Sequence, residues 1–393
     1  MRHLSSHFSP LAAAVLFVLT TVGCTTVQSQ DPIAPLFNGP VALSEPVTVG
    51  SQRVHLDTLL TGLDLPWGMA FLGADEMLIT ERGGRIRHVH GGMLQPDGVA
   101  GGPEVYVHGQ GGLLDVEAHP DYASNGWVYL SYANPGRGGG HTAIMRATLE
   151  NGGLTNQEVL FEGGPMTRGR VHFAGRLTFD RNNDLYFSIG DRGEMQNAQD
   201  LSNHSGKVFR LHDDGRVPAD NPFINTADAA PEIFTYGHRN PQGMALHPKT
   251  GALWTHEHGP QGGDEINIER AGANYGWPTI TYGINYNGSI ITEETERAGM
   301  EQPVHYWVPS IAPSGMDFAP ASRYPGWDGD LIVGALKFML LSHIDLDGDT
   351  FVAENRFFEG IGRVREVEVG PDGYLYVLTE APGALYRLWP ASE

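Results

Sequence analysis

One hydrophobic pattern recurs six times along the chain. Each copy contains a short alternation of apolar and polar residues, a polar turn and a second apolar run, and five of the six begin with a glycine. Period-two alternation bounded by turn residues is typical of β-strands, so each copy predicts an antiparallel hairpin. The copies start at Gly68, Gly112, Gly175, Gly243, Gly315 and Arg365.

The spacing of these copies indicates the fold class. They recur at intervals of roughly 45 to 70 residues, which leaves room for two further strands and loops in each unit. The pattern lacks the long amphipathic helices that an α/β barrel needs. The sequence therefore predicts an all-β, six-bladed β-propeller over residues 48–393. We expect the strand around Val54–Leu56 to close the ring by pairing with the last blade, and long loops such as Tyr282–Ser314 to carry function.

The first 47 residues do not follow the repeat. Residues 1–23 contain the apolar run Leu11–Leu19, which is far shorter than the roughly 20 residues that span a bilayer and is typical of a signal peptide. A small residue precedes Cys24, as in bacterial lipoprotein signals, in which the cysteine is lipidated; ordinary cleavage nearby is the alternative. Residues 24–47 are rich in Thr, Ser, Gln and Pro and are expected to form a tether. We expect an exported protein, periplasmic or anchored to the outer membrane through Cys24.

Composition narrows the choice of partners. The chain has 25 Lys and Arg against 46 Asp and Glu, a net charge of −21, which disfavours nucleic acid and anionic membrane surfaces. Its 52 Gly and 26 Pro favour turns over long helices, and 40% hydrophobic residues can supply a core. A single cysteine excludes an intrachain disulfide and a cysteine-based zinc site.

Three cations stand in unusual surroundings. Lys337 lies inside the apolar run Leu331–Leu341, which is expected to form a strand, so its ammonium must face solvent, a channel or an anion. Arg363 and Arg365 are two residues apart, which on a strand places both side chains on one face. Paired guanidiniums suit carboxylates or phosphate. We interpret the three residues as a candidate anion-binding site over the propeller axis. The alternative is that all three side chains face outward and that the two arginines pair with neighbouring glutamates.

Candidate catalytic residues lie where strands begin and end. His172 directly precedes the third copy and Asp191 follows its second strand, so the hairpin should bring the two together. A histidine with a carboxylate partner is a candidate general base. Gln110 occupies the equivalent position before the second copy. Arg239 and Asn240 precede a proline and are expected on a loop that enters a blade.

A glycine-rich stretch, Glu257–Pro278, offers oxygen ligands. Gly259–Pro260 exposes backbone carbonyls and Asp264–Glu265 adds carboxylates, a donor set that suits Ca²⁺ if the stretch is more than a turn. Two other segments are interpreted as structural: Arg87–His90 as an exposed strand, and Asp345–Asp349 as a hairpin turn, because its glycine is misplaced for a calcium loop.

Several segments, in this order, resemble the soluble quinoprotein sugar dehydrogenases of the glucose/sorbosone dehydrogenase family. They are HGQGGLLDV, HF-x-GRL-x-FD, YGHRNPQGMA, EHGPQGGDEIN with NYGWP, GALK, and RVR ahead of EVGPDGYLYVLTE. The similarity runs from about Leu63 to Leu388. It implies a six-bladed propeller that uses pyrroloquinoline quinone (PQQ) and Ca²⁺ to oxidise aldose sugars at the anomeric carbon, giving lactones.

The resemblance also implies roles for individual residues. His172 would be the general base, with Asp191 orienting its imidazole. Arg239 would polarise the quinone carbonyl that receives hydride. The other implied cofactor contacts are Gln110, Asn240, Lys337, Arg363 and Arg365.

The same resemblance implies metal ligands and partners. The carbonyls of Gly259 and Pro260 would hold the Ca²⁺ that bridges protein and PQQ, and Glu265 with the Tyr275 carbonyl would form a further, structural Ca²⁺ site. An aldose sugar would be the substrate, and an unidentified acceptor of the respiratory chain would take the electrons. The alternatives are a metal-dependent propeller lactonase, which leaves the converging cations unexplained, and a non-enzymatic envelope propeller that binds protein or glycan.

Overall fold

The computed structural model describes residue 1 and residues 36–391. Strands dominate this part of the chain; the helical segments are α1 (Tyr122–Asn125) and the 3₁₀ turns η1 (Met195–Gln199) and η2 (Pro325–Trp327). None of its helices is both long and apolar enough to cross a membrane. The signal peptide and Cys24 lie outside the described residues, so export and lipidation remain predictions.

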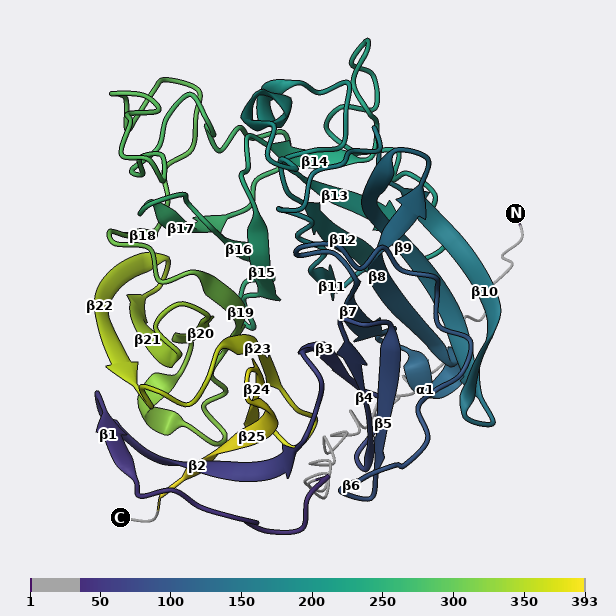
Figure 1. Ribbon diagram of the computed structural model, residues 1–393, viewed down its shortest axis with the longest axis vertical. Coiled ribbons are helices and arrows are strands. Elements are labelled where there is room, and N and C mark those ends of the chain that lie inside the picture. The colour runs from purple at the N-terminus through teal and green to yellow at the C-terminus, as the bar shows by residue number, and fades with distance from the viewer. Residues whose placement is uncertain (2–35, 392–393) are drawn as a thin grey trace. The chain divides into compact units, whose positions relative to one another are not determined.

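Six antiparallel sheets follow one another around a ring (Figure 1). The first three are β3 (Pro66–Phe71), β4 (Glu76–Glu81), β5 (Arg85–His90) and β6 (Met93–Leu94); β7 (Leu113–Ala118), β8 (Trp127–Gly136), β9 (Gly139–Glu150) and β10 (Gly153–Glu162); and β11 (Leu177–Phe179), β12 (Asp184–Ile189), β13 (Lys207–His212) and β14 (Ile233–Tyr236). The next two are β15 (Pro241–Leu246), β16 (Leu253–Glu257), β17 (Asp264–Ile268) and β18 (His305–Trp307); and β19 (Pro313–Phe318), β20 (Leu331–Ala335), β21 (Leu340–Asp347) and β22 (Thr350–Phe357). The sixth combines β23 (Val364–Val369), β24 (Leu375–Glu380) and β25 (Gly383–Pro390) with β2 (Gln52–Thr61) and β1 (Val47–Val49).

The predicted six-bladed β-propeller is therefore confirmed. The first strand of each blade, β3, β7, β11, β15, β19 or β23, contacts the first strands of both neighbouring blades, so these six strands form the inner wall of the ring. Each of them coincides with the first apolar triplet of one sequence copy. The expected ring closure is also confirmed, because Val54 and Leu56 pair with Pro390 and Leu388 in antiparallel register.

Apolar side chains fill the spaces between neighbouring blades. One core cluster joins the last two blades through Trp327, Ile332, Val367 and Leu388, and another joins the first two. Fully burying such a side chain stabilises the fold by about 1.5–3 kcal/mol. Each sheet has two apolar faces, and each face must pack against a neighbouring sheet. The apolar runs of the sequence therefore favour six sheets that pack face to face around a ring.

The structure differs from the sequence interpretation in three places. Residues from Leu36 onward, predicted as part of the tether, instead pack on the propeller, with Leu36 and Phe37 buried. The run Leu331–Leu341 is not one strand but β20, a turn and β21. Arg87 is buried on its strand, whereas the neighbouring His90 is exposed as expected.

Candidate active site

His172 and Asp191 meet as the hairpin predicted. The imidazole Nδ1 of His172 lies 2.5 Å from Oδ1 of Asp191. Asp191 is almost fully buried, and it also accepts hydrogen bonds from the Gly193 amide and from Nε1 of Trp277 at 2.9 Å. A carboxylate held by three donors cannot rotate freely. It therefore fixes the orientation of the imidazole.

The backbone conformation of His172 is unusual and is fixed by a hydrogen bond. His172 has a φ of +57°, a left-handed conformation uncommon for residues other than glycine. Its amide donates to the side-chain carbonyl of Gln110 at 2.7 Å. This bond ties the histidine to the preceding blade, so the candidate base is positioned from two sides.

Electrostatics keep the imidazole neutral. Burial lowers the pKa of His172 below its usual range, and the charge of Arg239 lowers it further, against the opposing effect of Asp191. Burial acts to raise the pKa of Asp191, but the hydrogen bond and charge of His172 outweigh it and leave that pKa lowered. With Nδ1–H directed at Asp191, Nε2 is the ring nitrogen that can accept a proton at neutral pH.

Arg239 and Asn240 are held by a buried carboxylate. Oε2 of Glu257 accepts the amide of Arg239 at 2.5 Å and that of Asn240 at 3.4 Å. The guanidinium of Arg239 donates to the carbonyls of His258, at 3.0 Å, and Gly259, at 2.8 Å. Because Glu257 ends the second strand of the fourth blade, the loop that precedes this blade is fixed to its interior.

A cavity of about 220 Å³ lies where the inner strands begin. Four of the sequence-predicted residues line it: Gln110, Asn240, Arg363 and Arg365. Sequence reasoning missed other lining residues, among them Trp67, Arg82, Gln242, His258 and Glu380. Gln242 is two residues after Asn240 in a segment that the sequence analysis had selected. Because side chains two apart on a strand share a face, Gln242 could have been predicted with Asn240. No sequence motif pointed to Trp67.

The two predicted arginines share one carboxylate. Arg365 donates to Glu380 at 2.7 Å and to Gln242 at 2.9 Å, and Nε of Arg363 donates to Glu380 at 2.6 Å. Burial acts to raise the pKa of Glu380, but the charges of Arg365 and Arg363 hold it at about 2. Two cations against one carboxylate leave this wall of the cavity with a positive charge. It is suited to an anionic ligand.

Lys337 does not join this group. It is exposed in the turn between β20 and β21, next to Leu336, which does line the cavity. Its ammonium lies 5.2 Å from the ring centre of Phe338. The turn ends at Met339 with a φ of +54°, which explains why the apolar run does not continue as a strand.

The oxygen groups of the predicted Ca²⁺ sites gather beside Arg239. Gly259, Glu265 and Tyr275 line a cavity of about 10 Å³, which is the size of a single water molecule or ion. Burial and the nearby carboxylate of Glu257 raise the pKa of Glu265 to about 8. Two carboxylates close together in a buried place, with carbonyl oxygens around them, fit a hard divalent cation. Pro260 is buried but does not line this cavity.

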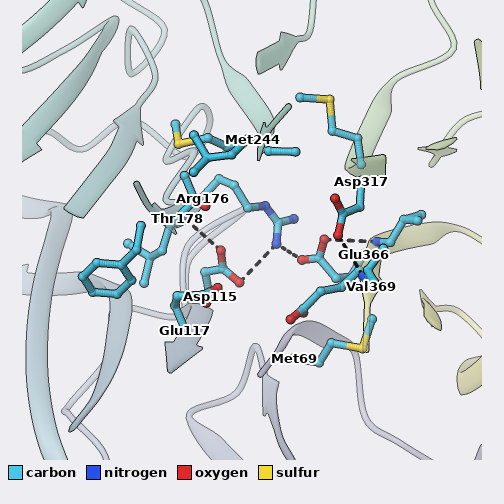
Figure 2. A pocket seen from close by; sticks show the side chains of 16 residues that line it. Met69, Asp115, Glu117, Arg176, Thr178, Met244, Asp317, Glu366 and Val369 are labelled. Atoms are coloured by element: carbon cyan, nitrogen blue, oxygen red, sulfur yellow. Dashed lines mark hydrogen bonds and ion pairs between the residues drawn. The ribbon is translucent and has the colours of Figure 1, made fainter. Parts of the chain in front are cut away.

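A second cavity, of about 260 Å³, lies toward the opposite end of the inner strands. Figure 2 shows the side chains that line it. Its carboxylates are Asp115, Glu117, Asp317, Glu366 and Glu368. Arg176 pairs with Asp115 at 3.1 Å and with Glu366, and it donates to the carbonyls of Gln242 and Arg365 in the first cavity. Arg176 therefore lies between the two cavities.

The acidic cavity should contribute less stability as the pH rises. Burial and neighbouring carboxylates raise the pKa of Glu117 and Glu368 well above the usual range, and burial raises the pKa of Asp317 to about 6. The folded protein therefore binds more protons here than the unfolded chain does, and the resulting stability is lost as pH rises. We expect the contribution of this cavity to the free energy of unfolding to be smaller at pH 8 than at pH 5. Histidines that burial keeps neutral, such as His256 with its pKa lowered to about 3, contribute in the opposite sense, so the prediction concerns the difference between variants.

Paired variants test this effect through urea unfolding at both pH values. Relative to wild type, Glu117→Gln should gain stability between pH 5 and pH 8, by an amount on the order of 1 kcal/mol. Glu359→Gln, at an exposed position away from the cavity, should have the same pH dependence as wild type. An identical pH dependence in wild type and Glu117→Gln would contradict the prediction.

Fold and site together define a class: six-bladed β-propellers with a cationic cavity where the inner strands begin and a His–Asp pair joined to its rim through Gln110. The model of the glucose/sorbosone dehydrogenase family matches residues 63–387 of this chain, so the chain belongs to that family. The resemblance predicted from the sequence motifs is thereby confirmed.

Individual relatives agree with this assignment. Aldose sugar dehydrogenase YliI of Escherichia coli K12 is 43% identical over 358 residues, covering 89% of this chain and 96% of the relative. A crystal structure of glucose dehydrogenase superimposes with a TM-score of 0.83 at 44% identity, covering 86% of this chain and 99% of that one. The PQQ-bound form of aldose sugar dehydrogenase from Streptomyces coelicolor gives a TM-score of 0.72 at 28% identity, with the same two coverages.

Proposed function

We propose that this protein is a PQQ- and Ca²⁺-dependent aldose dehydrogenase that oxidises sugars at the anomeric carbon and releases lactones. One observation carries the proposal: Gln110 lines the cationic cavity and at the same time holds the backbone of His172, whose ring is oriented by Asp191. The candidate base and the candidate cofactor cavity therefore belong to one rigid unit. The names of the relatives support the same reaction class.

The chain's residues suit the two proton and charge requirements of this reaction. Nε2 of neutral His172 accepts the proton of the anomeric hydroxyl, while the C1–H bond breaks and its electron pair leaves with the hydrogen as hydride. The sugar carbon thereby becomes the carbonyl carbon of a lactone. Asp191 stabilises the imidazolium that forms. PQQ, when bound, supplies the acceptor of the hydride.

The cofactor contacts follow from the cavity lining. Arg363 and Arg365 would hold anionic groups of PQQ, and Gln110 and Asn240 would donate hydrogen bonds to it. Arg239 does not line this cavity but lies next to Asn240, which does, and from there it would stabilise negative charge that develops on the cofactor. The cavity lined by Gly259, Glu265 and Tyr275 has room for one Ca²⁺, which these residues would hold. A second Ca²⁺ on the carbonyls of Gly259 and Pro260 is implied by the sequence resemblance alone. Lys337 is exposed beside the cavity rim and would reach the cofactor only from outside.

Reconstitution of the purified protein tests the proposal. Dye-linked oxidation of a panel of aldoses should appear only when PQQ and Ca²⁺ are both added. Arg239→Gln should lower kcat by about 10²–10³-fold, in the range seen when one preorganised charge-stabilising donor is removed. Arg356→Gln, on an exposed arginine of the fifth blade, is the matched control and should retain activity.

The opposite results are equally informative. If no aldose is oxidised and PQQ does not change the protein's absorbance or stability in titration, the proposal is wrong. Hydrolysis of lactones with a divalent metal alone would favour the lactonase, and glycan or protein binding without turnover would favour a binding propeller.

A further inference from the structure

Three potential metal ligands share one face of a hairpin in the first blade, on strands that do not line the central cavities. Glu76 begins β4, and His88 and His90 lie near the end of β5. Glu76 is directly opposite His90 in the antiparallel register, so both side chains point to the same side of the sheet. His88 is two residues from His90 and points to that side as well.

The ligand atoms of the three side chains are already close together. Each lies within 4.8 Å of the others, and this is the one such group of three or more His, Cys, Asp or Glu side chains in residues 36–391. Nε2 of His88 is hydrogen-bonded to Oε1 of Glu76 at 2.7 Å, and the two imidazole centres are 6.1 Å apart. Two atoms bound tetrahedrally to one zinc ion at about 2.0–2.2 Å lie roughly 3.5 Å apart. Binding therefore requires the side chain of exposed His90 to turn toward Glu76 and His88.

The surroundings leave room for an ion and for a further ligand. Glu76 and His88 are half-buried and held by the strand ladder, whereas His90 opens to solvent. His88 also lines a hollow of about 360 Å³ together with Gln95, Asp97 and Asn151. Water can therefore reach the fourth coordination position.

We propose that Glu76, His88 and His90 form a zinc site that nothing in the sugar-oxidising reaction requires. Two imidazole nitrogens and one carboxylate oxygen match the preference of Zn²⁺ for mixed nitrogen and oxygen ligands, whereas Ca²⁺ takes oxygen ligands. Bound zinc replaces the His88–Glu76 hydrogen bond and joins β4 to β5. It stabilises the first blade against opening.

A titration of the full-length protein with Zn²⁺ tests the site. Competition against a chromophoric chelator is measured with Ca²⁺ present in excess, so that sites made of oxygen ligands are filled. Wild type should bind one equivalent. His88→Gln and His90→Gln should each weaken binding by about 10-fold or more, since even the outer-shell partners of metal ligands are worth about 10–100-fold. Binding should also weaken at acid pH, where the imidazoles bind protons instead.

The chain offers a matched control. His212 is also a half-exposed strand histidine, bonded to the carboxylate of Asp184 at 2.7 Å, but it belongs to no group of three ligands. His212→Gln should bind zinc like wild type. Zinc should raise the Tm of wild type and His212→Gln and leave that of His90→Gln unchanged, while equal Tm values without zinc show that all variants are folded. Equal zinc affinity in wild type, His88→Gln and His90→Gln would overturn the proposal, as would the absence of any zinc binding to wild type.

Discussion

His172→Gln is expected to lower kcat/KM for aldose oxidation by about 10²–10⁴-fold, the usual contribution of a positioned general base. Nε2 of His172 is the proton acceptor in the proposed reaction, and glutamine supplies a side chain of similar reach that cannot take a proton. Nδ1 of the histidine is hydrogen-bonded to Asp191, and the side chain does not line the cavity proposed for PQQ. Binding of PQQ should therefore be retained. Steady-state rates with PQQ and Ca²⁺ saturating, and a separate PQQ titration, measure the two effects.

The pH profile separates a base from a structural histidine. Because burial lowers the pKa of His172, the rate should fall only on the acid side of the usual histidine range. Asp191 opposes this lowering, so Asp191→Asn should move the acid limb to still lower pH while reducing kcat. His55→Gln, on the outer strand β2, is a control that should change neither. A His172→Gln enzyme with a wild-type rate would exclude the histidine as the base.

Asp57→Ala is expected to destabilise the fold by about 3–5 kcal/mol, the cost of leaving a buried charge without its partner. Oδ2 of Asp57 accepts from Arg387 at 2.9 Å, and both side chains are fully buried. The other carboxylate oxygen accepts the amides of Val41 and Ala42 at 2.8 Å. The substitution therefore removes the group that joins β2, β25 and the segment before β1. Urea unfolding at fixed Ca²⁺ measures the loss.

Two further variants make this result specific to the buried pair. Asp328→Ala breaks the exposed Lys249–Asp328 pair and should change the free energy of unfolding by less than about 1 kcal/mol. The double variant Asp57→Leu/Arg387→Met leaves no unpaired buried charge and should recover part of the stability. The recovery is partial because the amides of Val41 and Ala42 still lose their acceptor. A loss for Asp57→Ala no larger than for Asp328→Ala would show that the ring closure does not depend on this pair.

The strand positions were predictable because they depend on short-range information. Alternation of apolar and polar residues within each copy specifies a hairpin, and neighbouring strands of one hairpin pair in the simplest register. The same reasoning brought His172 to Asp191, since the two flank a single hairpin of the third blade. Their 2.5 Å contact confirms that placement. The chemical role assigned to the pair remains a prediction.

The lining of the cationic cavity could not be predicted from local sequence patterns. Its wall combines Trp67 from the first blade, Gln242 from the fourth and Glu380 from the sixth, side chains that become neighbours only when six inner strands converge. Lys337 shows the converse. Its apolar neighbours indicated a strand, but a turn with left-handed backbone geometry at Met339 places the lysine in solvent.

By itself, the sequence determined the all-β class, the six blades, the family and the hairpin that unites the candidate base with its carboxylate, because each of these depends on patterns within a few tens of residues. Tertiary structure alone decided which cations enter the cavity, which carboxylates face one another at the opposite end, and that Asp57 meets Arg387 across 330 residues. Ring closure brings distant side chains into places with little water. In such places, burial and neighbouring charges shift the pKa of side chains. The sequence does not show which of these side chains become neighbours, because they are far apart in the chain.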